Sequence, residues 1–285
     1  MIYARTLAVF SILYLMLSCG PNTTGSVDKN QPENTNPAQD ILMSGFQEII
    51  DSAGVNGSIL IYDPQQHLYY SNNFEWAARG FLPASTFKIP NSIIALETGV
   101  VNDKETLFPW DGQKRRLSVW EKDMTFREAF HASCVPCYQE IARKIGIKRM
   151  REYLDRFQYG NMVFDSASID LFWLEGKSEI SQYGQVEFLE KFFTGKLPVS
   201  PRNQSMMKEL MVIENTGAFV ISGKTGWSIR NGNNNGWFVG YVEKNDQVFY
   251  FATNVIPLED FNMDLFASIR KDITYKALKS IGAIP

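Results

Sequence analysis

The sequence predicts a single α+β domain, in which an antiparallel β-sheet flanked by helices receives an inserted, mostly helical subdomain. Three observations support this fold class. Apolar, strand-like segments lie near both ends of the chain, at Gly57–Tyr62 and Gln247–Val255. Between them, the region from Thr86 to Gln158 has mostly helical spacing of its apolar residues. Of the 285 residues 45% are hydrophobic, which is enough apolar material for one substantial core.

The first 40 residues are interpreted as a targeting segment and a linker. A weakly basic start precedes an apolar run from Thr6 to Leu17, which is shorter than the roughly 18 residues of a membrane span. Residues 1–18 are therefore predicted to be a signal peptide. The segment up to Cys19 is similar to a bacterial lipoprotein box and predicts lipidation of Cys19, with plain signal-peptidase cleavage as the alternative. Residues 19–40 are almost all polar and are expected to form a disordered tether.

A folded domain is expected from residue 41 to residue 285, without a linker or a repeat. Apolar periodicity and turn residues predict its elements in order. They are a helix at Ile41–Ala53, a hairpin of Gly57–Tyr62 with His67–Ser71, a mostly helical middle, a hairpin of Trp237–Glu243 with Gln247–Val255, and a final helix at Met263–Ile281.

Charge and cysteine content limit the classes of function. The net charge of −3 and the absence of long basic runs do not favour nucleic-acid binding. The basic triplet Lys114-Arg115-Arg116 is interpreted as a solvated face. Cys134 and Cys137 flank two residues at a predicted helix start, and no histidine cluster completes a metal site. They are expected to be small buried side chains, with a disulfide as the alternative in an oxidising compartment.

The histidines do not favour a Ser-His-Asp triad or a zinc mechanism. The chain has two histidines, His67 and His131, and neither accompanies a G-x-S-x-G serine. The H-x-H and H-E-x-x-H patterns of zinc enzymes do not occur. A hydrolase with this sequence would therefore need another base, and lysine is the alternative.

Ser-x-x-Lys places a hydroxyl and an amine on one face of a helix, one turn apart. The spacing occurs four times, and only its context separates the matches. Ser26 lies in the tether, Ser205 begins a surface helix, and Ser268 lies inside the final helix. Ser85, paired with Lys88, follows a turn and precedes an apolar helix, so its hydroxyl is predicted at a helix N-terminus that stabilises a developing anion. The alternative for Ser85 is an ordinary N-cap.

Two further motifs lie downstream. Lys224-Thr225-Gly226 ends an apolar run and is predicted on a strand, where the glycine lets a ligand approach the backbone and the other two residues offer a cation and a hydroxyl to a carboxylate. Ser133 stands at a predicted helix start between the other two motifs, and alone it would be interpreted as an N-cap. Each alone is a weak signal.

Together and in this order, the three motifs resemble those of the penicillin-recognising serine enzymes. Further segments narrow the resemblance to the class D, or oxacillinase-type, β-lactamases over nearly the whole chain from Phe46 onward. They are Pro83-Ala-Ser-Thr-Phe-Lys88, Ser133-Cys-Val135, Tyr159-Gly-Asn161, Phe172-Trp-Leu-Glu-Gly176, Lys224-Thr-Gly-Trp227, Gly236-Trp-Phe-Val-Gly240 and Ser268-Ile-Arg270. Cys134 and Cys137 depart from the family's usual residues, which are small or apolar.

The resemblance implies that Ser85 attacks a β-lactam carbonyl and that Lys88 is N-carboxylated by CO₂ and serves as general base. It also implies that Val135 and Trp173 surround that carbamate, with the Trp173 indole donating to it. A physical reason supports carboxylation. A free lysine with a pKa near ~10.4 is protonated at neutral pH, and an apolar site keeps the amine neutral.

The same resemblance assigns roles to five further residues and to two backbone N–H groups. Ser133, with Lys224 nearby, relays a proton toward the leaving nitrogen. The backbone N–H groups of Ser85 and Trp227 form an oxyanion hole. The binding residues for the substrate carboxylate are expected to be Thr225, Gly226 and Arg270.

The sequence therefore predicts an exported, lipid-anchored hydrolase of β-lactam antibiotics that confers resistance in the periplasm or cell envelope. It is expected to need no metal and no cofactor besides CO₂ or bicarbonate. Leu117 and Ile229 are predicted at the rim of the substrate pocket. Two alternatives share the motifs: the sensor domain of a penicillin receptor, which stays acylated, and a peptidoglycan DD-peptidase. Substrate spectrum and oligomeric state are left open.

Overall fold

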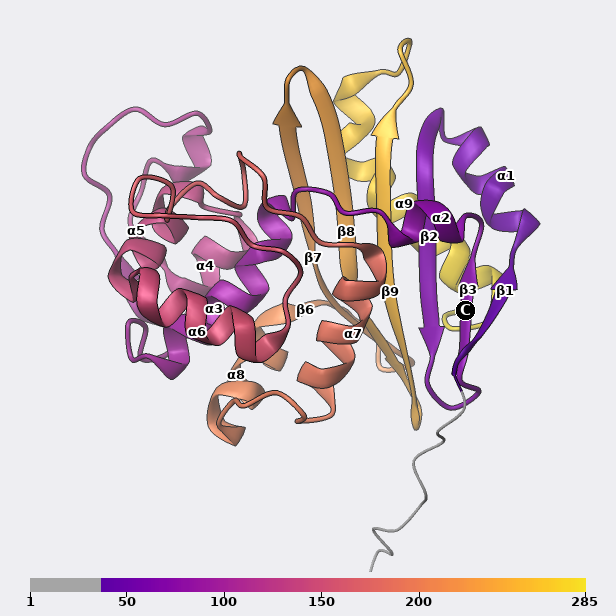
Figure 1. Cartoon of the computed structure of the whole chain (residues 1–285), viewed down its shortest axis with the longest axis horizontal. Coiled ribbons are helices and arrows are strands. Elements are labelled where there is room, and N and C mark those ends of the chain that lie inside the picture. The colour runs from indigo at the N-terminus through magenta and orange to yellow at the C-terminus, as the bar shows by residue number, and fades with distance from the viewer. Residues whose placement is uncertain (1–36) are drawn as a thin grey trace, which may run out of the picture. The chain divides into compact units, whose positions relative to one another are not determined.

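The computed structural model describes residues 37–285. Their central element is a seven-stranded β-sheet (Figure 1). The predicted signal peptide, Cys19 and most of the predicted tether lie outside these residues. The strand order is β1-β3-β2-β9-β8-β7-β6. The strands are β1 (Gln39–Leu42), β2 (Val55–Asp63), β3 (Leu68–Ser71), β6 (Val212–Asn215), β7 (Val220–Arg230), β8 (Asn233–Lys244) and β9 (Gln247–Pro257).

The sheet joins the two ends of the chain, as predicted. Strand β2 pairs antiparallel with β9, and the hairpins β2–β3 and β8–β9 lie where the sequence placed them. Asn245, in the turn between β8 and β9, has a φ of 53°, a left-handed conformation that asparagine tolerates and tight hairpins need. The two hairpin predictions are confirmed.

The predicted helix at Ile41–Ala53 is wrong at its start. Residues Gln39–Leu42 form β1, which runs parallel to β3, and helix α1 covers only Ser44–Ser52. The backbone of Gln39 donates to the His67 carbonyl at 3.1 Å, and that of Met43 to the Ser71 carbonyl at 2.8 Å. This pairing partner is remote in sequence, so the spacing of apolar residues does not reveal it.

Helices cover both faces of the sheet, and a further group lies beyond its β7 edge (Figure 1). Helices α1 and α9 pack on one face, and α2 and α7 on the other. The helices are α1, α2 (Phe74–Ala78), α3 (Lys88–Glu97), α4 (Phe126–His131), α5 (Val135–Ile145), α6 (Ile147–Phe157), α7 (Gln182–Phe193), α8 (Pro201–Met211) and α9 (Phe266–Ser280), with the short helices η1 (Ala84–Phe87), η2 (Ser118–Trp120) and η3 (Met263–Leu265). Residues 37–285 contain no helix long and apolar enough to cross a membrane.

The inserted helical subdomain was predicted for Thr86 to Gln158, and helices α3 to α6 fall within that range. A two-stranded sheet of β4 (Leu107–Phe108) and β5 (Met124–Thr125) interrupts it. Helix α4 begins with a capping box, in which Thr125 and Glu128 satisfy each other's backbone N–H groups.

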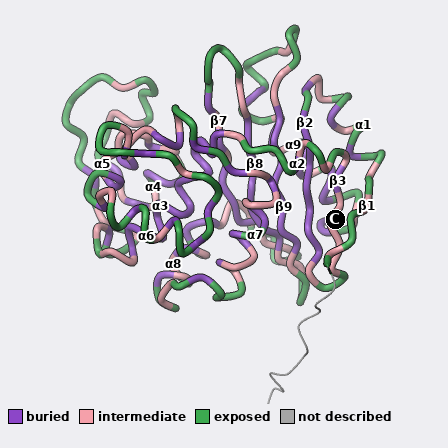
Figure 2. The backbone as a smooth tube through the Cα atoms, in the orientation of Figure 1, coloured by how far each residue is buried: buried purple, intermediate pink, exposed green. Residues whose placement is uncertain are grey.

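The sheet separates two apolar clusters because successive side chains of a strand point to opposite faces. In β2, Ile59 and Ile61 pack toward α1 and α9, whereas Leu60 and Tyr62 pack into the larger cluster with the helical subdomain. Figure 2 shows that buried residues follow the central strands and helix α3. Helix α3 is buried along nearly its whole length, so the residues at its start are held on a rigid element.

Candidate active site

Ser85 and Lys88 meet at the junction of η1 and α3. Ser85 lies in η1 and Lys88 is the first residue of α3, so the two side chains are one turn apart. The Lys88 Nζ donates a hydrogen bond to the Ser85 Oγ at 3.1 Å. Ser85 is 9% exposed and Lys88 only 1%. The pair therefore combines a nucleophile that lines the cavity with a base that is shielded from water.

The backbone before Ser85 is held in an unusual conformation. Ala84 has a φ of 51°, which residues with a side chain rarely adopt. Its N–H donates to the Trp173 carbonyl at 2.8 Å, and the Thr86 Oγ1 donates to the Pro83 carbonyl at 2.6 Å. Such a conformation persists only where the surroundings determine it, and it is frequent at active sites.

Burial and a neighbouring cation act on the Lys88 amine. Burial lowers the pKa of Lys88 well below its ordinary value, and the positive charge of Lys224 lowers it further. The amine also lies 4.9 Å from the centre of the Tyr138 ring. Within residues 37–285 no carboxylate acts against these two effects, so the site favours the neutral form of the Lys88 amine.

Ser133 and Lys224 form the second Ser–Lys pair, although 91 residues separate them. The Lys224 Nζ donates to the Ser133 Oγ at 2.5 Å and to the Thr225 carbonyl at 3.1 Å. Burial, with the charges of Arg270 and Lys271, lowers the pKa of Lys224 to about 7. Ser133 has a φ of 52°, and the cap of α5 is Cys134, so Ser133 is not the N-cap that its sequence position allowed.

Strand β7 presents a free edge to η1. Among the described strands, β6 pairs with β7 only from Val220 to Ser222, whereas β8 pairs with its other edge as far as Arg230. Beyond Ser222, the edge of β7 that β6 leaves unpaired therefore faces η1. A Cβ at Gly226 would lie 3.1 Å from the Pro83 carbonyl and 3.2 Å from the Thr86 nitrogen. The two backbones meet closely because Gly226 has no side chain.

A cavity of about 630 Å³ opens over the nucleophile. The predicted site residues that line it are Ser85, Ser133, Val135, Thr225, Gly226, Trp227 and Arg270. Lys88, Trp173 and Lys224 lie behind its wall and are at most 5% exposed. Leu117 and Ile229 also line the cavity and are exposed, as a rim position requires.

The sequence missed the basic side of this cavity. Lys114, Arg115 and Arg116 line it, although the triplet was interpreted as a solvated face. Lys114 pairs with Glu121 at 3.2 Å, and Arg115 with Asp111 at 2.6 Å. Three adjacent charges do not reveal in sequence that their loop folds over a cavity.

Arg270 is already largely committed to the backbone. Its Nε donates to the Phe266 carbonyl at 3.0 Å, its Nη2 to the Ala267 carbonyl at 2.9 Å, and its Nη1 to the Gly226 carbonyl. A guanidinium has five N–H donors, so one N–H on each terminal nitrogen remains. Because Arg270 lines the cavity, these two N–H groups are the donors that remain for a substrate carboxylate.

Trp173 has a buried polar atom without a partner. Its indole Nε1 is buried and makes no hydrogen bond among the described residues. The ring stacks on Phe87, with centroids 5.2 Å apart, and meets Phe172 edge to face. A buried donor without an acceptor costs free energy, so an acceptor placed beside this N–H would be stabilised by it.

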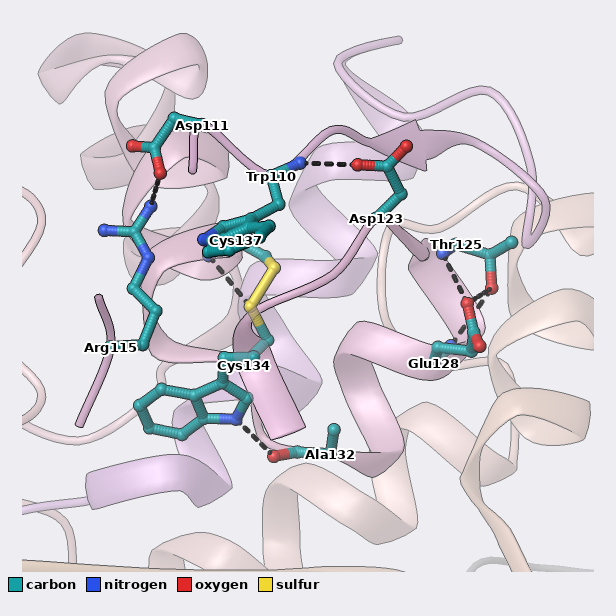
Figure 3. The surroundings of a disulfide bond; sticks show 10 residues. Trp110, Asp111, Arg115, Asp123, Thr125, Glu128, Ala132, Cys134 and Cys137 are labelled. Atoms are coloured by element: carbon teal, nitrogen blue, oxygen red, sulfur yellow. Dashed lines mark hydrogen bonds and ion pairs between the residues drawn. A yellow bond between two sulfur atoms is a disulfide. The ribbon is translucent and has the colours of Figure 1, made fainter. Parts of the chain in front are cut away.

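Cys134 and Cys137 form a disulfide, the alternative that the sequence left open (Figure 3). It closes the first turn of α5, with Val135 and Pro136 between its ends. Both cysteines are buried, at 2% and 9% exposure, so the expectation of small buried side chains is also met.

The fold, the cavity and the two Ser–Lys pairs define the penicillin-recognising class of serine enzymes. A family model described as the penicillin binding protein transpeptidase domain matches residues 54–274. Beta-lactamase OXA-10 of Pseudomonas aeruginosa is 38% identical over 95% of this chain and 97% of that protein. The crystal structure of a class D β-lactamase from Sebaldella termitidis covers 88% of this chain and 100% of its own, at 35% identity and a TM-score of 0.83. The chain belongs to the class D β-lactamases.

A regulatory protein is a more distant relative. Regulatory protein BlaR1 of Bacillus licheniformis is 28% identical over 88% of this chain, which corresponds to 42% of that protein. The similarity to OXA-10 is higher and extends over nearly the whole of both proteins. The comparison therefore places this chain with the β-lactamases rather than with the regulatory protein BlaR1.

Proposed function

We propose that the protein hydrolyses β-lactam antibiotics through an acyl-enzyme on Ser85. The observation that carries the proposal is the hydrogen bond between the Ser85 Oγ and the buried Lys88 Nζ at the base of the cavity. A serine hydroxyl is a weak nucleophile until a neighbouring base takes its proton. Lys88, whose pKa is lowered by burial, is the group positioned to do so.

Other residues fit the later steps of this reaction. Attack on the lactam carbonyl places negative charge on its oxygen, and backbone N–H groups of Ser85 and Trp227 would stabilise that charge. The pair of Ser133 and Lys224, with a pKa of about 7 for the lysine, can pass a proton to the departing nitrogen. Thr225 and the remaining donors of Arg270 would bind the substrate carboxylate.

N-carboxylation of Lys88 fits the residues around it. CO₂ adds to a neutral amine with loss of one proton, and burial keeps the Lys88 amine neutral. The unpartnered indole N–H of Trp173 would supply a donor for the new anion. When present, the carbamate supplies a general base that a protonated lysine cannot be. Trp173 would orient this base, and the apolar Val135 would shield it.

Turnover separates this proposal from the two alternatives. A penicillin receptor or a DD-peptidase would also acylate Ser85, but the acyl group would persist. Deacylation needs a base that activates water, and the buried Lys88 is proposed to provide it in this chain.

Ser85→Ala is expected to abolish acylation by a penicillin and to lower kcat by at least about a thousandfold. Ser205→Ala and Ser268→Ala are matched controls, because both serines are exposed and keep the same spacing to a lysine. They should leave kcat within about twofold. Mass spectrometry of the mixed protein and penicillin would reveal the adduct. Penicillin attached to another serine of Ser85→Ala, or an adduct that never clears from wild type, would contradict the proposal.

We further propose that the protein is exported and held at a membrane by a lipid on Cys19, and that it confers resistance in the cell envelope. The lipoprotein-like box and the polar segment after it support this. The disulfide supports an oxidising compartment. Mass spectrometry of the mature protein should find its N-terminus at a diacylated Cys19, and Cys19→Ala should release the protein from membranes. An unmodified N-terminus elsewhere would contradict the anchor.

A further inference from the structure

The Cys134–Cys137 disulfide encloses part of the cavity wall. Cys134 is the N-cap of α5 and Cys137 is its third residue. The two residues between them, Val135 and Pro136, both line the cavity, and so does Ser133 directly before. One short covalent ring therefore contains two wall positions, Val135 and Pro136, and adjoins a third, Ser133.

The disulfide does the work of an N-cap. Ser, Thr, Asp and Asn are the usual N-caps, because a side-chain oxygen accepts an N–H of the first turn. Here the Cys134 Sγ takes that place and accepts from the Cys137 N–H at 3.2 Å. Sulfur is a weak acceptor, so the hydrogen bond alone is a poor cap. The covalent bond fixes the same two residues (Figure 3).

Ser133 directly precedes this fixed turn. Its φ of 52° is a conformation that a residue with a side chain keeps only where its surroundings hold it. On its N-terminal side, the Ser133 N–H donates to the Phe130 carbonyl at 3.2 Å, and the Trp120 indole donates to the Ala132 carbonyl at 2.9 Å. On its C-terminal side the disulfide begins at the next residue.

The rest of α5 is held independently of the disulfide. The Tyr138 hydroxyl and the Ser92 hydroxyl of α3 are 2.7 Å apart, and both are buried. Ile141, Ala142 and Ile145 continue the apolar face of α5 in the core. Opening the disulfide should therefore loosen the first turn of the helix without unfolding it.

We propose that the Cys134–Cys137 disulfide is a positioning device for turnover, which holds Ser133 against Lys224 and Val135 in the cavity wall. It makes the activity dependent on redox conditions. Reduction by a dithiol such as dithiothreitol transfers two electrons and two protons. The S–S bond breaks to two thiols, and the dithiol closes to its own cyclic disulfide. This inference rests on the proposed β-lactam hydrolysis.

The first experiment compares oxidised and reduced wild-type protein. Peptide mapping after alkylation reports the state of residues 134–137. Reduction is expected to lower kcat for a penicillin by about fivefold or more, because a small displacement of a reacting group is costly. KM should change less than twofold, since Thr225 and Arg270 lie on β7 and α9. Reoxidation should restore kcat. Protein kept reduced from expression onward supplies the reduced state if the buried bond resists the reagent.

Two variants separate positioning from simple stabilisation. The double variant Cys134→Ala/Cys137→Ala should have the kcat of reduced wild type and should not respond to dithiothreitol. The variant Cys134→Ser/Cys137→Ala reinstates an oxygen N-cap and should recover part of the lost kcat. The thermal midpoint is measured alongside. If either variant does not fold, the comparison of oxidised with reduced wild type decides.

Three results would contradict either the proposed function or the positioning role of the disulfide. An oxidised protein that does not turn over any β-lactam refutes the proposed function itself. A protein that turns over a penicillin with the same kcat when oxidised, reduced or doubly substituted refutes the positioning role alone. A fall in kcat that matches the loss of folded protein, with no change per folded molecule, also refutes it.

Discussion

Lys88 and Trp173 leave complementary needs at the base of the cavity. Burial lowers the pKa of Lys88 and so favours its neutral amine, and the Trp173 N–H has no acceptor within residues 37–285. A carbamate on Lys88 would meet both needs, because it replaces a neutral amine with an anion that accepts a hydrogen bond. At the scale of single residues, the proposed carboxylation would make CO₂ and protons compete for one nitrogen, that of Lys88.

This competition predicts a response to bicarbonate. Lowering the pH protonates the amine and removes the form to which CO₂ adds, so activity in degassed, mildly acidic buffer should fall severalfold. Adding bicarbonate at fixed pH should restore it. Initial rates of penicillin hydrolysis, with ionic strength held constant, measure the effect. A rate that ignores bicarbonate at every pH would exclude the carbamate while leaving Ser85 as nucleophile.

Trp173→Phe is the matched variant for this test. It keeps an aromatic ring against Phe87 but removes the indole donor. The variant should need more bicarbonate for half-maximal activity and should deacylate more slowly than it acylates. If it matches wild type in both respects, the indole does not hold the base.

At the scale of elements, the seam between β7 and η1 is fixed by Gly226. A Cβ there would come within 3.1 Å of the Pro83 carbonyl and of the Thr86 Cγ2, on both sides of Ser85 in the chain. These are tighter than most contacts of a Cβ, and the carbonyl belongs to the backbone. The close contact at Gly226 therefore fixes the position of Ser85 relative to strand β7.

Gly226→Ala should push η1 away from β7 and lower kcat/KM for a penicillin by roughly tenfold, since small displacements of reacting groups are costly. Gly45→Ala is the control, because a Cβ at Gly45 would meet nothing within 4 Å. Gly45 lies in α1, so this change should leave kcat/KM unaltered and stabilise the helix by about 0.5–1 kcal/mol. Steady-state kinetics and thermal unfolding of both variants test the difference. Equal kinetics would show that the seam adjusts to a methyl group.

At the scale of the whole molecule, the sequence predicted the order of the elements better than their contacts. Apolar, strand-like runs and turn residues located the two hairpins, since both signals are local. The parallel strand at Gln39–Leu42 depends on a partner some 29 residues away in register, Leu68–Ser71, and left no local signal. That Ser85, Lys88, Ser133 and Lys224 share one site was predicted only through the family resemblance of their motifs. The lining by Lys114–Arg116 depends on how a loop folds over the cavity, which spacing does not encode. The disulfide is local, and the spacing of Cys134 and Cys137 left it open beside two free cysteines.

The cavity draws its wall from positions as far apart as Ser85 and Arg270. An unfolded chain therefore has no binding site, and any occupant binds only the folded form. By mass action, an occupant at a hundred times its Kd stabilises the fold by about 2.7 kcal/mol. A β-lactam that is bound or slowly released would thus protect the protein from proteases. The antibiotic prolongs the life of the enzyme that destroys it.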